Sequence, residues 1–97
     1  MNPLAARDEI IEAIKKVSDP EIGLDVWTLG LIYELDIKDD KVNIIMTFTS
    51  PMCPFGPDMV EEIKDEIKKT GIKEVTVEIV FDPPWQPSDE VREMLGF

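Results

Sequence analysis

The sequence predicts a small two-layer α/β (α+β) domain, in which a three-stranded mixed sheet carries helices on one face in the order α-β-β-α-β-α. Two observations predict this fold. The hydrophobic pattern alternates between the period of an amphipathic helix and the two-residue period of a half-buried strand. The middle strand–helix–strand unit is also expected to cross over right-handed, which makes its two strands parallel. With 97 residues the chain fits one domain, residues 1–97.

The first helix is expected to begin at Asn2-Pro3, an N-cap residue followed by proline in the first helical position. Ile14 and Val17 lie on its predicted apolar face. Because Pro20 disfavours helical angles at the residue before it, the helix should end near Val17 or Ser18.

From residue 31 the pattern predicts a strand, with apolar residues at every second position: Leu31, Tyr33, Leu35 and Ile37. Asp39-Asp40 is the expected turn to an antiparallel second strand. The residues of that strand expected to share one face are Val42, Ile44, Met46 and Phe48.

A rigid loop with three prolines, residues 50–57, precedes the second helix, which should begin inside it or just after it. The predicted apolar stripe of this helix comprises Val60, Ile63 and Ile67, and Gly71 is its expected C-cap.

The third strand should again have an apolar residue at every second position: Val75, Val77, Ile79 and Phe81. Ser88 is expected to cap a last short helix, which Gly96 closes. The inner face predicted for this helix comprises Val91, Met94 and Leu95.

Charge and composition exclude several classes of function. Lys and Arg number 10 against 21 Asp and Glu, so the net charge of −11 would repel nucleic acids and anionic membranes. No apolar run reaches the roughly 20 residues that span a bilayer, and acidic residues interrupt the N-terminal segment, so a cytoplasmic protein is expected. Histidine is absent and Cys53 is the single cysteine, which excludes Ser–His and Cys–His pairs and imidazole-based zinc sites.

Three loops interrupt the patterned elements and are expected to converge at one edge of the sheet, because antiparallel and parallel neighbours bring their ends together there. The residues in these loops that could carry chemistry are Asp19, Glu21, Thr28, Gly30, Thr49, Cys53, Asp82, Pro83, Pro84 and Trp85.

Several of these side chains have two interpretations from residue type alone. Cys53 is the only soft ligand and strong nucleophile, or it is an inert buried thiol. Asp19 and Glu21 are metal or acid–base carboxylates, or a turn former and a solvated side chain. The loop threonines donate hydrogen bonds to a ligand or cap the loop backbone. Trp85 is a recognition aromatic or a lid over the core.

The strings DPEIGLDVWTLGLIY, TFTSPMCP and DPPWQPSDEVREMLGF, in this order, resemble the SufT/PaaD-like family of iron–sulfur cluster assembly factors. The resemblance runs from about residue 18 to residue 96. It implies a small α/β fold and a role in maturing iron–sulfur proteins, in which the family acts beside scaffold and carrier proteins to deliver clusters to apo-proteins. The family includes the targeting subunit of the eukaryotic cytosolic machinery. Its PaaD-like members are associated with the reductase of an aromatic-ring hydroxylase.

The resemblance also assigns positions within the family's motifs. The family's acidic pair falls on Asp19 and Glu21, and its reactive cysteine on Cys53. Many members have a glycine directly before that cysteine, where this chain has Met52. The remaining motif positions are Thr28, Gly30, Thr49, Asp82, Pro83, Pro84 and Trp85.

The leading hypothesis is a non-enzymatic maturation factor, in which Cys53, with Asp19 and Glu21, contacts a transient iron–sulfur cluster or iron. One cysteine cannot supply the four thiolates usual for a cluster, so a homodimer, a partner's cysteines or carboxylates would complete the site. The alternatives are a protein-binding adaptor with no metal of its own, a PaaD-like accessory factor, and a thiol enzyme, which the lack of a histidine disfavours.

Overall fold

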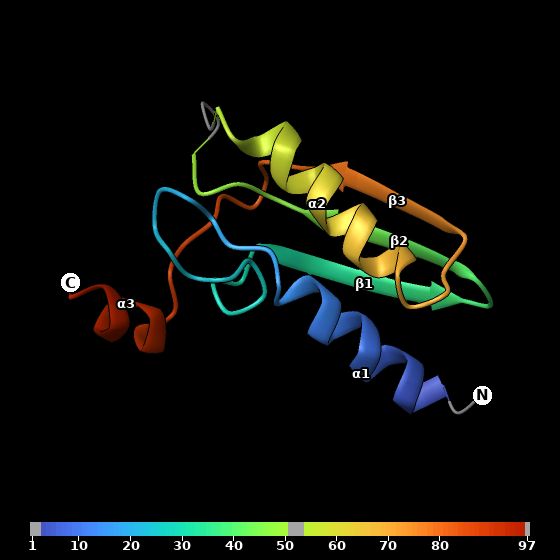
Figure 1. Cartoon of the computed structure of the whole chain (residues 1–97). Helices are drawn as coiled ribbons and strands as arrows, with labels where there is room; N and C mark the ends of the chain where they lie inside the picture. Colours follow the sequence, from blue (N-terminus) through green and yellow to red (C-terminus); the bar gives the residue numbers. More distant parts are fainter. Residues whose placement is uncertain (1–2, 51–53, 97) are drawn as a thin grey trace.

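This computed structural model describes residues 3–50 and 54–96, with side chains from residue 7 onward. Its element order confirms the prediction of helix, strand, strand, helix, strand, helix (Figure 1). The elements are α1 (Pro3–Ile14), β1 (Ile32–Lys38), β2 (Lys41–Met46), α2 (Gly56–Lys68), β3 (Glu74–Ile79) and α3 (Asp89–Leu95).

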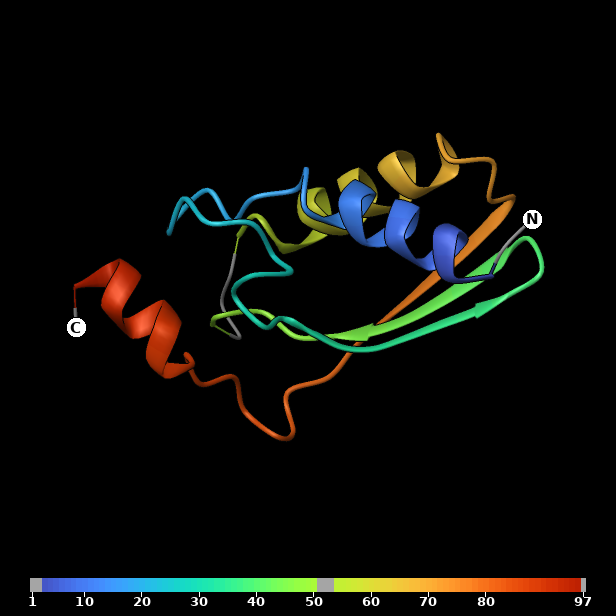
Figure 2. The same ribbon diagram turned by 90° about the horizontal axis from the view of Figure 1, so that it is seen from below.

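The three strands form one mixed sheet in the order β1-β2-β3. β1 pairs with β2 antiparallel across the Asp39-Asp40 turn, and β2 pairs with β3 parallel, which confirms the predicted topology. Figure 2 shows α1 and α2 on the same side of the sheet and the short α3 beyond its end. The opposite face of the sheet carries no helix in the described part of the chain.

The core lies between the sheet and the helix layer. Ile44 and Met46 from β2 are fully buried, as are Ile14 from α1 and Ile63 and Ile67 from α2. Burial of one such side chain contributes about 1.5–3 kcal/mol to the free energy of folding, so this layer contact is the main source of stability. No described helix is both long enough and apolar enough to cross a bilayer.

The end of α1 differs from the prediction. The helix ends at Ile14 rather than near Val17 or Ser18. Lys16 N–H donates to the Ala13 carbonyl at 3.2 Å, and Val17 N–H donates to the Ile14 carbonyl at 3.0 Å. These bonds span three residues, so the last turn tightens, yet Val17 stays buried and preserves the apolar pattern. The predicted N-cap, Asn2, lies outside the described residues.

The strands are shorter than their apolar patterns. In β1 the register shifts between Ile32 and Glu34, so Tyr33 is an additional residue and Ile32 instead lies opposite the buried Met46. Phe48 and Phe81 lie beyond the ends of β2 and β3, where their rings contact edge to face with centroids 6.2 Å apart.

The buried face of α2 and its C-cap differ from the prediction. The buried stripe of α2 comprises Gly56, Met59, Ile63 and Ile67, so Met59 takes the place predicted for Val60. The C-cap of α2 is Lys69 rather than Gly71, which instead has a φ of 104° in the following turn.

Ser88 caps α3 by accepting a hydrogen bond from Val91 N–H at 3.2 Å, and Gly96 closes the helix with a φ of 79°, both as predicted. Val91 is buried and Leu95 packs against the core, whereas Met94 is 53% exposed. The prediction for Met94 is wrong because α3 lies at the end of the sheet and only one narrow side of it reaches the core.

Candidate functional site

Asp19 is a fully buried carboxylate in the loop after α1. Its Oδ1 accepts a hydrogen bond from Glu21 N–H at 2.8 Å, and its Oδ2 accepts one from the Thr49 hydroxyl at 3.2 Å. Burial of an ionisable group is costly unless it is hydrogen-bonded, and here both carboxylate oxygens have a donor. The second bond joins the loop after α1 to the segment after β2.

The backbone around Asp19 folds back on itself. Asp19 N–H donates to the Leu24 carbonyl at 2.9 Å, while the Asp19 carbonyl accepts from Gly23 N–H at 2.7 Å. Gly23 has a φ of 86°, a conformation that glycine adopts without steric cost. This closed turn leaves Glu21 exposed at its tip.

The second half of the same loop is held by Asp25, which the sequence interpretation did not single out. Asp25 Oδ2 accepts a hydrogen bond from Thr28 N–H at 2.9 Å, and its carbonyl accepts from Leu29 N–H at 3.0 Å. An aspartate three residues before the threonine was the available signal, because such side chains often bond to nearby backbone amides. Gly30 follows with a φ of 79°.

The third loop, which follows β3, is hydrogen-bonded to the first loop and to the start of β1. Trp85 Nε1 donates to the Leu29 carbonyl at 2.7 Å, and the Tyr33 hydroxyl donates to the Pro83 carbonyl at 2.9 Å. Trp85 packs against the core as a lid, whereas Asp82 and Pro84 are exposed.

These contacts bring together residues 19–30, 47–50 and 82–85, which we call the loop rim. The hydrogen bonds from Thr49 to Asp19 and from Trp85 to Leu29 join all three segments. Cys53, the predicted reactive residue, lies outside the described residues. The described chain before it ends at residue 50, directly after Thr49, and resumes at residue 54, two residues before α2 begins.

Gly56, the first residue of α2, is a positioning residue that sequence reasoning missed. A Cβ atom at this position would lie 2.6 Å from Cε2 and Cζ of Phe48. The helix therefore begins in direct contact with the Phe48 ring, and only glycine allows this approach. A glycine between Phe55 and Pro57 was the signal in the sequence, because a backbone without a side chain often marks close packing.

Metal-ligating groups do not form a cluster in the described parts of the chain, 3–50 and 54–96: no three Cys, Asp or Glu side chains there lie close enough to hold an ion. Asp19 is buried, and both of its carboxylate oxygens accept hydrogen bonds. Glu21 contacts Asp19 through its backbone N–H and not through its carboxylate.

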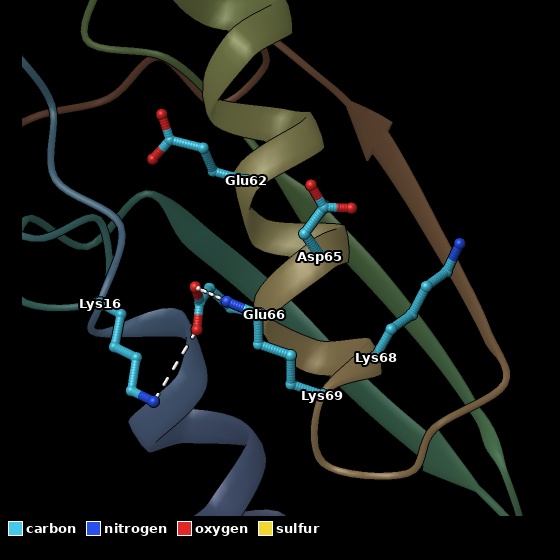
Figure 3. A pocket seen from close by; sticks show the side chains of 6 residues that line it. All are labelled: Lys16, Glu62, Asp65, Glu66, Lys68 and Lys69. Atoms are coloured by element: carbon cyan, nitrogen blue, oxygen red, sulfur yellow. Dashed lines mark hydrogen bonds and ion pairs between the residues drawn. The ribbon is translucent and has the colours of Figure 1, made fainter.

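A solvent-open hollow of about 600 Å³ lies on the helix layer rather than at the loop rim (Figure 3). Glu66 Oε1 accepts from Lys69 Nζ at 2.8 Å, and Glu66 Oε2 lies 3.8 Å from Lys16 Nζ. The hydrogen bond from Lys69 lowers the pKa of Glu66, and the same bond raises the pKa of Lys69. These charged side chains pair with one another on the solvent-exposed surface of the helices. We therefore interpret the hollow as the surroundings of a solvated ion-pair network and not as a candidate site.

Comparison with known proteins places the chain in a defined group. The family model described as "Iron-sulfur cluster assembly protein" matches residues 7–79. The chain is 40% identical over 83 residues to the Fe-S protein maturation auxiliary factor YitW of Bacillus subtilis, covering 84% of this chain and 81% of the relative. It is 39% identical over 71 residues to the Fe-S protein maturation auxiliary factor SufT of Staphylococcus aureus, covering 71% and 81%.

A solved structure with the same fold is the conserved hypothetical protein TM0487 from Thermotoga maritima. Its TM-score to this chain is 0.80, with 43% sequence identity over 94% of each chain. The match therefore covers nearly the whole length of both chains.

Proposed function

The chain belongs to the iron–sulfur cluster assembly protein family, and from this premise we propose that it helps transfer iron–sulfur clusters to apo-proteins, with Cys53 as the contact to cluster or iron. Its role is in iron–sulfur protein maturation. The observation that carries the more specific proposal is the hydrogen bond from Thr49 to the buried Asp19. This bond holds the segment that leads to Cys53 against the loop after α1.

Cys53 acts on the cluster as cargo and does not hold it permanently. A cluster is usually held by four thiolates, and this chain has one. The remaining ligands come from the donor or acceptor protein, or from a second copy of the chain. Transfer then proceeds as one protein's thiolates replace another's, which needs no enzymatic step by this chain.

The two acidic candidates take different parts in this proposal. Glu21 is exposed at the tip of its turn, so its carboxylate is available to contact iron or a partner. Asp19 uses both oxygens within the rim, so direct contact with iron would require it to release Thr49. We therefore assign Asp19 first to positioning and only second to metal contact.

The other motif residues support the same rim. Thr28 and Gly30 belong to the turn that Asp25 caps, and Trp85 fixes the loop of Asp82, Pro83 and Pro84 over it. The expected partners are scaffold or carrier proteins and apo-protein targets in the cytoplasm. The net charge of −11 favours partner surfaces that are basic.

A protein-binding adaptor is the second candidate, and one observation favours it. Phe55, Phe81 and Met94 are large apolar side chains with 41%, 47% and 53% exposure, and the last two lie on segments that flank the loop rim. Exposed apolar side chains are typical of docking surfaces where they form a contiguous patch. In an adaptor Cys53 would be dispensable.

Complementation separates the two candidates. In a bacterial strain that lacks its own relative of this protein, the wild type should restore the activity of an iron–sulfur enzyme, and Cys53→Ser should not. Glu61→Gln, at an exposed position on α2 outside the loop rim, is the control and should restore activity. Full rescue by Cys53→Ser would favour the adaptor.

A further inference from the structure

β3 forms an outer edge of the sheet, and its pairing with β2 is regular along its whole length (Figure 1). Glu74 N–H donates to the Asp40 carbonyl at 3.3 Å, and Val80 N–H donates to the Met46 carbonyl at 2.9 Å. Because alternate residues of a strand bond to the same neighbour, the amides of the intervening residues 76 and 78 also face β2. The amides of Val75, Val77 and Ile79 therefore face outward from the free edge.

The two edges of the sheet differ. On β1, Arg7 Nη1 of α1 donates to the Leu35 carbonyl at 3.2 Å, and the register shift at Tyr33 interrupts the regular pairing. Bulges and covering side chains are common means of blocking an edge strand. Over residues 74–79, β3 has no bulge and no proline, and no described backbone group bonds to its outer side. Of the two sheet edges in the described chain, the β3 edge is therefore the one whose backbone groups are open for pairing.

The side chains of β3 divide into two rows. Val75 is buried under the helix layer with 8% exposure, whereas Val77 and Ile79 on the same face are only half-buried. An apolar side chain beside them would complete their cover. On the opposite face Glu74, Thr76 and Glu78 are exposed.

The glutamates on this face are not equivalent. Glu74 lies 3.6 Å from Lys41 Nζ, which offsets its charge. Glu78 has no cationic partner among the described residues, and its neighbours across the sheet are Ile45 and then the acidic Glu34. The acidic end of the face adjoins the loop rim, because β3 runs from residue 79 directly into it.

We propose that the free edge of β3 binds an extended segment of a partner protein in which apolar residues alternate with Lys or Arg. The segment adds a fourth strand to the sheet. Its apolar side chains pack beside Val77 and Ile79, and a basic side chain lies beside Glu78. Main-chain hydrogen bonds supply affinity and the alternating side chains supply specificity.

A second copy of this chain is a poorer occupant. β3 has the sequence EVTVEI and contains no basic residue, so another β3 offers neither glutamate a positive partner. Each chain also has a net charge of −11, which opposes self-association.

The inference rests on the proposed function for the role of the partner, since the added strand would hold an apo-protein beside the rim. Its test reads binding alone and does not involve Cys53. The probes are two synthetic peptides of alternating sequence, Val-Lys repeated four times and Val-Glu repeated four times, added to the full chain. Hydrogen exchange of individual amides is followed by NMR.

We expect the Val-Lys peptide to slow exchange at the amides of Val75, Val77 and Ile79, with little change at Glu74, Thr76 and Glu78, which already bond to β2. The Val-Glu peptide should have little effect. Glu78→Lys should weaken binding of the Val-Lys peptide about fivefold and strengthen that of the Val-Glu peptide, since opposite charges across strands attract and like charges repel.

Glu61→Lys, an exposed position on α2, is the control with the same change in net charge and should leave both affinities nearly unchanged. Equal weakening in both variants would mean general charge attraction and would overturn the proposal. So would binding without protection of the three outward amides, or protection that grows with protein concentration in the absence of peptide. A cluster-transfer defect in Cys53→Ser with normal peptide binding would leave this inference intact.

Discussion

The Thr49 hydroxyl donates a hydrogen bond to the buried carboxylate of Asp19 at 3.2 Å, although the two residues lie 30 positions apart in the chain. Thr49 precedes the segment of Cys53, and Asp19 begins the loop that the Trp85 lid closes from the other side. The contact therefore joins the loop after α1 to the end of the described segment after β2.

Thr49→Val tests this contact. The substitution keeps the volume of the side chain but leaves one oxygen of a buried carboxylate without a donor, which costs about 1–3 kcal/mol. We expect the free energy of unfolding in urea to fall by this amount. Thr49→Ser keeps the hydroxyl and should lose much less; equal losses in the two variants would contradict the role of the hydrogen bond.

Gly56→Ala tests the close approach of α2 to Phe48. The new Cβ would lie 2.6 Å from the ring, so the ring or the helix start must move, at a cost of about 1–3 kcal/mol. Phe48→Leu in the same chain should relieve part of this cost, because it removes the ring carbons. A double-mutant cycle measures the coupling, and simple additivity of the two changes would show that the contact is not strained.

Trp85→Phe tests the lid. The variant keeps an aromatic ring but loses the Nε1 donor to the Leu29 carbonyl, so we expect a loss of about 1 kcal/mol in the free energy of unfolding. Trp27→Phe is the matched control, because Trp27 packs against the core and its ring N–H has no hydrogen bond in the described chain. A loss in the control as large as in Trp85→Phe would point to ring packing rather than the hydrogen bond.

Acid titration tests the ion pairs of the helix layer. The hydrogen bond from Lys69 lowers the pKa of Glu66 in the folded chain, so the unfolded chain binds more protons there. This stabilisation is present above the unfolded pKa of about 4.3 and is lost as the pH falls through the lowered folded value. Thermal unfolding across that range should show a weaker pH dependence for Glu66→Gln than for Glu62→Gln, and equal dependence would contradict the assignment.

The sequence was informative where a local pattern determines structure. The order of the elements, the parallel crossover and the Ser88 cap each follow from periodicity or capping chemistry, and the structure confirms them. Local pattern failed where tertiary packing decides. Tyr33 was placed in a regular alternation because a periodic pattern cannot reveal a register shift. Met94 was placed on the inner face of α3 because a helical stripe cannot show that α3 lies beyond the sheet.

For the loop rim, too, the sequence predicted the general arrangement but not the individual contacts. That the three loops converge follows from strand direction, and the contacts of Thr49 and Trp85 agree with it. The hydrogen bond between Asp19 and Thr49 could not be predicted, because the two residues lie 30 positions apart and the residues around each of them do not indicate the contact. The close approach at Gly56 likewise depends on a distant aromatic ring.

Anaerobic reconstitution with iron and sulfide tests the central claim most directly. The wild type, Cys53→Ser and the α2 surface control Glu61→Gln are compared by absorbance and by size-exclusion chromatography, and each sample is then mixed with an apo-ferredoxin. We predict an iron–sulfur chromophore on the wild type and on Glu61→Gln, its transfer to the apo-ferredoxin, and loss of both in Cys53→Ser. A chromophore and transfer that persist in Cys53→Ser, or their absence from the wild type, would contradict the role of Cys53 in contacting the cluster.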